Sequence, residues 1–203
     1  MMKKPSFPGF SADSSPHALA RRFFSSPPTL ETPRLILRPL QRGDARDLFA
    51  WCSDPQVSRY VLWEPHQSLS ETRAYIQYVR RLYREALPSS WGIVDRNSHH
   101  VIGTIGLMFY SSENRSCEIG YSMSRDYWGR GLMSEAVSAL IRILFHNLAL
   151  NRIEAQHDVR NPRSGRVLEK CGMTREGILR SRIINKGETV DVVLWSILRS
   201  DLS

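Results

Sequence analysis

The sequence is poor in cysteine, in long apolar runs and in acidic residues, and each shortage excludes a class of protein. Its three cysteines, Cys52, Cys117 and Cys171, lie far apart and form no CxxC pair, which excludes a disulfide framework and favours a reducing, cytoplasmic location. The most apolar stretch, 136–150, is interrupted by serine, arginine, histidine and asparagine. It falls short of the roughly 18 apolar residues of a membrane span, so no membrane partner is expected.

Basic residues outnumber acidic ones. Lysine and arginine total 28 against 20 aspartates and glutamates, which gives a net charge of +8. Such a balance points to an acidic partner, which could be a nucleic acid, an anionic membrane face or a phosphate-bearing cofactor, or it serves solubility alone. With 203 residues, 41% of them hydrophobic, the chain suits one ordinary folded domain and a tail.

Residues 1–28 differ in composition from the rest. They are rich in Ser, Pro, Phe and Arg and contain a single acid, Asp13. They lack the apolar core of a signal peptide, and their five prolines argue against a helical transit peptide. We therefore expect a disordered N-terminal extension over 1–28 and one folded domain over 29–203.

The rest of the chain predicts a mixed α/β layer around one sheet. Asp44 is a candidate helix cap, and Ser68 with Glu71 forms a capping-box pattern. Expected strands lie near 35–40, 91–94, 101–109, 117–123, 152–156, 174–179 and 190–198. Expected helices follow Asp44 and Ser68 and cover 132–148 and 161–171.

A glycine-containing loop joins the strand at 117–123 to the helix at 132–148. Gly129 and Gly131 allow consecutive N–H groups to turn toward one point. Together with the positive end of the helix, this turn predicts a phosphate site at the first helical residues, Leu132, Met133 and Ser134. The flanking Arg125 and Arg130 could add charge-assisted contacts. The pattern is neither a Walker loop nor a Rossmann fingerprint, and a tight turn without a ligand is the alternative.

The segment 127–136, YWGRGLMSEA, resembles the acetyl-CoA pyrophosphate loop of the GNAT N-acetyltransferase superfamily. More narrowly, it resembles the RimJ/RimL branch, which acetylates the N-terminal amines of ribosomal proteins. Blocks at 31–38, 118–121 and 161–177 agree in order and spacing, so the resemblance covers about 31–198. It implies a mostly antiparallel, seven-stranded sheet flanked by helices and splayed between its fourth and fifth strands. It also implies acetyl-CoA as co-substrate, with no metal.

The resemblance also implies roles for single residues. Glu118 would accept the proton of the amine, directly or through a water, and Ser164 would donate a hydrogen bond to the departing thiolate. Asn161 would hold the pantetheine arm, which would also pair with the backbone between Tyr121 and Met123.

Each of these roles has a structural alternative. Glu118 could be a surface or arginine-paired glutamate, Ser164 a first-turn helix hydroxyl, and Asn161 an N-cap. His100 and His157 are competing candidates for the base.

The sequence departs from the family pattern at two positions. Asp126 stands where the loop normally carries Gln or Arg, so Arg125 or Arg130 would have to supply the charge. Leu168 stands where many members carry a tyrosine general acid, which leaves that role to Ser164.

The acceptor is less constrained than the cofactor. A protein N-terminal α-amine, with ribosome association, is favoured over a small-molecule amine such as an antibiotic, amino acid or polyamine. The rivals are a non-catalytic acyl-CoA-binding module and a nucleic-acid-binding protein, the latter opposed by the scatter of the arginines along the chain. Either a monomer or a homodimer is compatible with the sequence. Four aromatic residues could wall the acceptor cleft or belong to the core: Trp51, Trp63, Tyr75 and Tyr78.

Overall fold

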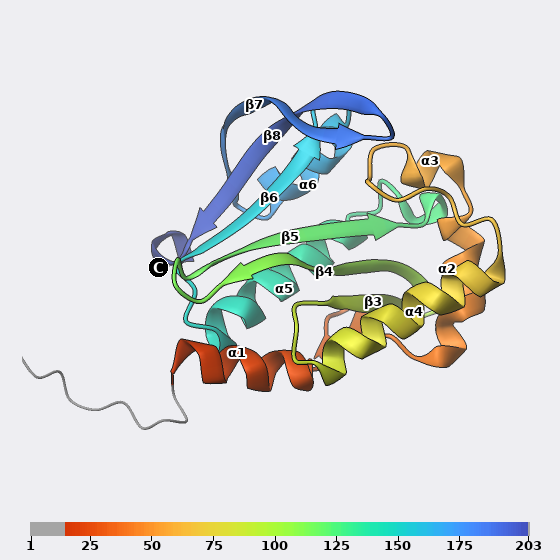
Figure 1. The fold of residues 1–203 in the computed structure, drawn as a ribbon, viewed down its shortest axis with the longest axis horizontal. Coiled ribbons are helices and arrows are strands. Elements are labelled where there is room, and N and C mark those ends of the chain that lie inside the picture. Colours follow the sequence, from red (N-terminus) through yellow and green to blue (C-terminus); the bar gives the residue numbers. More distant parts are fainter. Residues whose placement is uncertain (1–14, 203) are drawn as a thin grey trace, which may run out of the picture.

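A computed structural model describes residues 15–202 of the chain (Figure 1). The strands are β1 (Leu30–Glu31), β2 (Leu35–Pro39), β3 (Ser90–Asp95), β4 (Val101–Ser111), β5 (Ser116–Met123), β6 (Arg152–Asp158), β7 (Thr174–Asn185) and β8 (Glu188–Leu198). The α-helices are α1 (Pro16–Ser25), α2 (Ala45–Cys52), α3 (Pro55–Ser58), α4 (Leu69–Arg84), α5 (Leu132–Asn147) and α6 (Pro162–Lys170). Short 3₁₀ helices are η2 (Arg42–Asp44), η3 (Arg125–Tyr127) and η4 (Arg199–Leu202). None of the described helices is long and apolar enough to cross a bilayer.

The strands form one sheet in the order β1-β2-β3-β4-β5-β6-β8-β7. Seven strands are expected from the sequence, and the eighth is β1, whose two residues pair with β2. Among the described strands, every neighbouring pair is antiparallel except β5 and β6, which run parallel. The mixed α/β fold with a mostly antiparallel sheet is therefore confirmed.

β5 and β6 separate soon after they meet. Three residue pairs join them, and the last is Glu118 with Glu154. Beyond this point β5 continues to Met123 beside β4, whereas β6 continues to Asp158 beside β8, and the two ribbons diverge (Figure 1). The expected splay is confirmed, and we call the region between 119–123 and 155–158 the strand gap.

Helices cover both faces of the sheet (Figure 1). α5 packs on one face with α1 and α6, over a core that includes Trp91, Ile105 and Leu140. α2 and α4 pack on the other face, where Leu48 and Ile76 belong to a second core. The strand residues of this second core come from the β2–β4 half of the sheet, so it stops short of the strand gap.

The segment before the sheet is partly helical. Ser15 Oγ accepts a hydrogen bond from the Ala18 N–H at 3.2 Å and caps α1. Phe23 and Phe24 on this helix are 7% and 2% exposed, because they find apolar partners in distant strands. Trp91 Nε1 also donates to the Pro28 carbonyl oxygen, at the end of this segment, at 2.8 Å. The prediction of a disordered extension over 1–28, with a domain starting at 29, is therefore wrong for 15–28; residues 1–14 lie outside the described residues.

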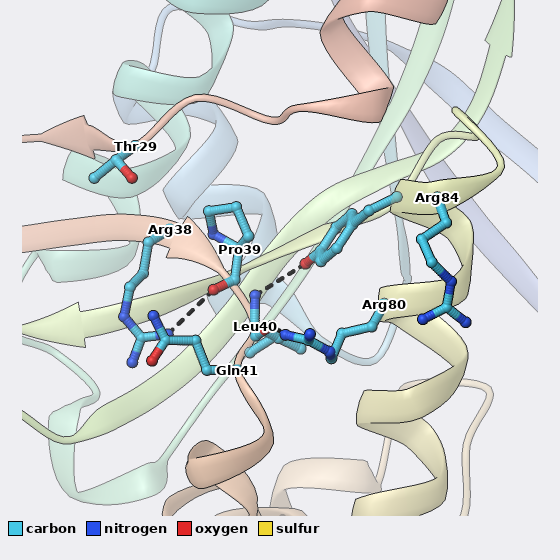
Figure 2. Close-up of a pocket in the computed structure, with 8 residues that line it drawn as sticks. Thr29, Arg38, Pro39, Leu40, Gln41, Arg80 and Arg84 are labelled. Carbon is cyan, nitrogen blue, oxygen red and sulfur yellow. Dashed lines mark hydrogen bonds between the residues drawn. The ribbon is translucent and has the colours of Figure 1, made fainter.

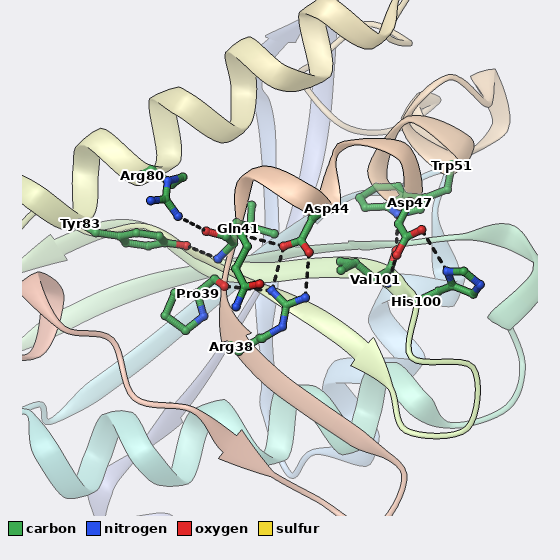
Figure 3. A network of polar contacts seen from close by, with 11 residues as sticks. Arg38, Pro39, Gln41, Asp44, Asp47, Trp51, Arg80, Tyr83, His100 and Val101 are labelled. Carbon is green, nitrogen blue, oxygen red and sulfur yellow. Dashed lines mark hydrogen bonds and ion pairs between the residues drawn. The ribbon is translucent and has the colours of Figure 1, made fainter.

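A polar network holds the start of α2 (Figure 3). Asp44 stands at the expected N-cap position, but its carboxylate does not cap the helix. Instead it accepts two hydrogen bonds from Arg38, both 2.8 Å long, and one from the Gln41 N–H at 2.7 Å. One turn later, Asp47 accepts from the Val101 N–H at 2.9 Å. These contacts tie α2 to β2 and β4.

Candidate active site

The strand gap exposes one edge of the β5 backbone. The Ser124 N–H donates to the Ile102 carbonyl at 2.8 Å, which fixes the side on which β5 faces β4. Because backbone groups alternate in direction along an antiparallel strand, those of Tyr121 and Met123 point to the other edge. There β6 offers no ladder partner beyond Glu118. An extended amide chain can pair with such an edge as an added strand.

The loop before α5 holds its two glycines in the left-handed region. Gly129 and Gly131 have φ values of 76° and 75°, which residues with a Cβ rarely adopt. Gly131 is the N-cap and provides no side-chain cap, so the N–H groups of Leu132, Met133 and Ser134 have no intrahelical acceptor. These donors and the positive helix end form a site suited to an anion. The predicted turn geometry is present.

Hydrogen bonds from one loop residue and from one distant residue hold this loop in place. Trp128 Nε1 donates to the Met123 carbonyl at 2.8 Å, which joins the loop to the end of β5. Arg34 donates to the Glu135 carboxylate at 2.7 Å and to the Arg130 carbonyl at 2.9 Å. Sequence reasoning missed Arg34 and Glu135, although both lie inside the blocks that carried the family resemblance. Their separation of 101 residues gave no local signal.

The arginines around the loop differ in their availability. Arg125 forms an ion pair with Asp54 at 3.2 Å, so its charge is already balanced. The Arg130 guanidinium lies 5.2 Å from the centre of the Tyr127 ring. Arg163, at the start of α6, lies 5.5 Å from the Trp128 ring centre. Within residues 15–202 neither Arg130 nor Arg163 has an acidic partner, and Arg163 is a candidate that the sequence did not reveal.

Glu118 lies where β5 and β6 part. Its neighbours Cys117 and Ile119 are buried in the core beneath α5, so its own side chain points to the opposite face. Gln156 Nε2 donates to Glu118 Oε1 at 3.0 Å. Burial raises the pKa of Glu118, the Gln156 bond opposes this, and Glu154 adds a like charge that raises it further. A half-buried carboxylate with a raised pKa is suited to general-base chemistry.

Two apolar side chains are exposed close to Glu118. A β-bulge between Leu107 and Phe109 shifts the register of β4, and Phe109 pairs directly with Glu118. Met108 and Phe109 are 64% and 55% exposed. The bulge cannot be read from the alternation pattern, so neither side chain was predicted for the site. Together they give the carboxylate an apolar rim.

A hydroxyl pair lies on the opposite face of the sheet from Glu118. Ser164 Oγ and the Tyr121 hydroxyl are 2.9 Å apart, and burial raises the pKa of Tyr121. Asn161 Oδ1 accepts from the Ser164 N–H at 3.4 Å, so the N-cap alternative for Asn161 is present. Glu118 and Tyr121 are an odd number of residues apart on one strand, which places their side chains on opposite faces. The structure therefore joins Ser164 to Tyr121 and Asn161 on one face of the sheet, and the Glu118 side chain lies on the other face.

His157 and His100, the two histidines considered as bases, are each held by contacts with neighbouring residues. The His157 ring is 6.3 Å from that of Trp195 beneath α6, its Nδ1 donates to the Asp158 carbonyl, and burial lowers its pKa. His100 bonds to Asp47 at 3.0 Å, at the β3–β4 turn (Figure 3). Within residues 15–202, no three His, Cys, Asp or Glu side chains are grouped as metal ligands. His157 also lies beside the strand gap, but its ring packs against Trp195 and against Gly165 of α6, so Glu118 is the better-placed candidate base.

The aromatic residues considered as a cleft wall fall into two groups. Trp51 is 5% exposed, and Trp63 and Tyr75 pack against the same core under α4. Tyr78 is 50% exposed and lies on the outward face of α4. Trp51 is therefore a core residue, and Trp63 and Tyr75 are partly buried against the same core.

Comparisons with known proteins agree along most of the chain. A family model described as an acetyltransferase (GNAT) domain matches residues 34–174. A Bacillus licheniformis protein named as an uncharacterized N-acetyltransferase, p20, is 38% identical over 173 residues, covering 85% of this chain and 97% of that protein. The [ribosomal protein uS5]-alanine N-acetyltransferase of Escherichia coli (strain K12) is 27% identical over 180 residues, covering 85% and 91%. The crystal structure of a GNAT-family acetyltransferase from Bacillus anthracis superposes with a TM-score of 0.77 at 25% identity, covering 85% and 99%.

Proposed function

The chain belongs to the GNAT family of acetyltransferases and is an N-acetyltransferase, and we propose that it acetylates the α-amine at the N-terminus of a protein chain. The family takes its acetyl group from acetyl-CoA. The observation that carries the proposed acceptor is the Glu118 carboxylate, which within residues 15–202 has a hydrogen bond from Gln156 but no ion-pair partner. It lies beside a gap whose wide end is covered by the β7–β8 hairpin.

The cofactor fits the elements around the gap. The first-turn N–H groups of α5, with Arg130 beside them, suit its pyrophosphate. The backbone N–H and C=O of Tyr121 and the N–H of Met123 suit the amides of its pantetheine arm, whereas the Met123 carbonyl is bonded to Trp128. Because the Asn161 amide oxygen caps α6, its NH₂ group is the part that can donate to a pantetheine carbonyl.

The acetyl-transfer reaction needs three contributions from the residues of the chain. As the amine nitrogen attacks the thioester carbon, Glu118 accepts the proton that the nitrogen loses, directly or through one water. A backbone N–H at the free edge of β5 stabilises the negative carbonyl oxygen. When the C–S bond breaks, the Ser164 hydroxyl, oriented by Tyr121, donates a hydrogen bond to the thiolate.

The β7–β8 hairpin closes the wide end of the gap. Lys186 at its tip donates to the Ser58 carbonyl of α3 at 2.8 Å and lies 3.5 Å from the Glu64 carboxylate. The N-cap of α3, Asp54, is in turn paired with Arg125 just after β5. This ring of contacts, seen beside α3 in Figure 1, favours an acceptor that enters across the sheet by a free end. A chain terminus satisfies that requirement.

The charges around Glu118 favour a single amine. Arg152 donates to both Glu154 and Glu176, so these acids are already paired. A polyamine carries several ammonium groups and would call for several unpaired carboxylates. An α-amine titrates near 8 and a lysine near 10.4, so deprotonating lysine at neutral pH costs about 3 kcal/mol more. The relative named for a ribosomal protein makes ribosomal-protein termini the first acceptors to try.

The acceptor class is tested by offering acetyl-CoA with a mixed pool and reading products by mass. The pool contains peptides with Ser, Ala, Thr and Met N-termini, spermidine, amino acids and an aminoglycoside. We expect one acetyl group on peptides with a free N-terminus, and none on the same peptides when the terminus is blocked and an internal lysine is free. A product formed on spermidine or an aminoglycoside alone would overturn the acceptor and favour the small-molecule alternative. Binding of acetyl-CoA with no product in the pool would favour a non-catalytic module.

Replacing Gly131 by alanine should weaken acetyl-CoA binding by about tenfold. A Cβ in this left-handed backbone costs roughly 1–2 kcal/mol, which the loop can relieve by moving the first N–H groups of α5. Gly187→Ala is the matched control, because Gly187 has a φ of 82° with open space around it and lies at the hairpin tip. Calorimetric titration without acceptor should show a loss for Gly131→Ala alone. Equal affinities for both variants would contradict the phosphate site.

A further inference from the structure

The outward face of α4 is lined with arginine. Thr72, Ile76, Val79 and Tyr83 point into the core, and the opposite side of the helix is exposed. The outward residues include four arginines, and Glu71 and Glu85 flank them. Glu85 lies 3.8 Å from Arg81 and balances that one charge. The α4 arginine face, as we call it, comprises Arg73, Gln77, Tyr78, Arg80, Arg81 and Arg84. It spans about 16 Å of helix.

A surface cavity of about 380 Å³ adjoins this face (Figure 2). Arg38 lines it, but Asp44 neutralises that charge through two hydrogen bonds. Arg80 donates to the Leu40 carbonyl at 3.2 Å, which positions the guanidinium and leaves its other N–H groups to a ligand. Arg84 extends from the next turn of α4 on the same side of the cavity (Figure 2). Two guanidinium groups thus give the cavity a net positive charge.

A second hollow continues the first along the helix. It is lined by Ala74, Gln77, Tyr78, Arg81 and Arg84, so Arg84 borders both hollows. Tyr78 is half exposed, and the Arg81 guanidinium lies 5.4 Å from its ring centre. An exposed aromatic ring between arginines is the pairing that stacks bases and contacts phosphates in single-stranded nucleic acids.

We propose that the α4 arginine face binds single-stranded nucleic acid, with phosphates on Arg80 and Arg84 and a base on Tyr78. Guanidinium groups bind phosphate in a bidentate manner, and the net charge of +8 supports association with a polyanion. The arginines look scattered in the sequence because it does not show which of them share a surface. An anionic membrane fits less well, since the outward positions hold no aliphatic side chain larger than Ala74.

The face is separate from the acetyl-transfer site. α4 packs on the β2–β4 half of the sheet, and neither hollow is lined by a residue of the strand gap. Variants on the outward face should therefore change nucleic-acid binding without changing acetyl transfer to a short peptide, so this proposal and the proposed function can fail independently.

The test is fluorescence polarisation with labelled RNA and DNA single strands of one sequence, about 15 nucleotides long, over a range of salt concentrations. The paired substitution Arg80→Gln and Arg84→Gln should weaken binding by about tenfold, and the slope of log K against log salt should fall by about 1.4, at roughly 0.7 per lost phosphate contact. Tyr78→Ala should weaken binding at least about fivefold through lost stacking. The control pair, Arg142→Gln with Arg180→Gln, removes the same charge from exposed positions on α5 and β7 and should retain most of the affinity.

Three results would overturn the proposal. The first is absence of binding to either strand at low salt. The second is an equal loss in the control pair, which would mean that net charge alone acts. The third is stronger retention by vesicles containing phosphatidylserine than by either strand, which would identify a membrane as the partner. Binding of RNA in preference to DNA supports the proposal and identifies the source of the strand.

Discussion

Glu118→Gln should lower kcat/KM for peptide acetylation by about 10²- to 10³-fold at neutral pH, the usual contribution of a positioned general base. The amide keeps the shape and can still bond to Gln156, so acetyl-CoA binding should be unchanged. Steady-state kinetics with a free-terminus peptide and calorimetric titration of acetyl-CoA separate the two effects. Transfer at close to the native rate would show that Glu118 is not the base.

The pH profile gives the same assignment a second test. A base works in its deprotonated form, so wild-type kcat/KM should fall as the pH drops through the pKa of Glu118. Because burial raises that pKa, this fall should begin above the range of an ordinary glutamate. In Glu118→Gln only the fall caused by protonation of the amine itself, which titrates at about 8, should remain. Glu154→Gln is the matched control. Removing this like charge lowers the pKa of Glu118, so the acidic limb should move to lower pH while activity remains.

Phe24→Ala should lower the free energy of unfolding by about 3–5 kcal/mol, as for other large-to-small changes at buried aromatic positions. Phe24 is 2% exposed, and its ring centre lies 5.6 Å from that of Phe23 and 5.2 Å from that of Tyr110. The loss follows because the cavity would open between α1 and the sheet. Urea unfolding of the full chain measures it.

Arg21→Ala is the control on the same helix. Arg21 is exposed, so its replacement should change stability by less than about 0.5 kcal/mol. If Phe24→Ala cost no more than Arg21→Ala, α1 would contribute nothing to the fold, and residues 15–28 would behave as the extension that composition predicts.

The sequence predicted those parts of the fold that have a local signal. The apolar repeat of α5 and the Lys186–Gly187 turn are patterns confined to a few neighbouring residues. α1 has no such signal, because its prolines and serines suggest disorder. Its aromatic face is recognisable as a core surface only once Trp91 is packed against it. The two residues of β1 form a strand only because β2 lies beside them.

In the candidate site, too, the residues with a local sequence signal could be predicted and those held by distant contacts could not. Gly129 and Gly131 could be predicted, since the turn before a helix constrains its own residues. The ion pair that occupies Arg125 could not, because Asp54 reaches it from another element. The contact between Tyr121 and Ser164 joins positions 43 residues apart, and no pattern in one sequence reports it. The roles of these residues in catalysis stay predictions until the variants are measured.

The short β5–β6 junction also bears on the persistence of the protein in a cell. Three residue pairs join the two parts of the sheet along this seam, so a ligand that spans the gap adds contacts to both parts at once. Any ligand that binds the folded chain alone raises its stability, by about 2.7 kcal/mol at a concentration 100 times its Kd. The supply of acyl donor would then set how often the seam opens and how readily proteases reach the chain.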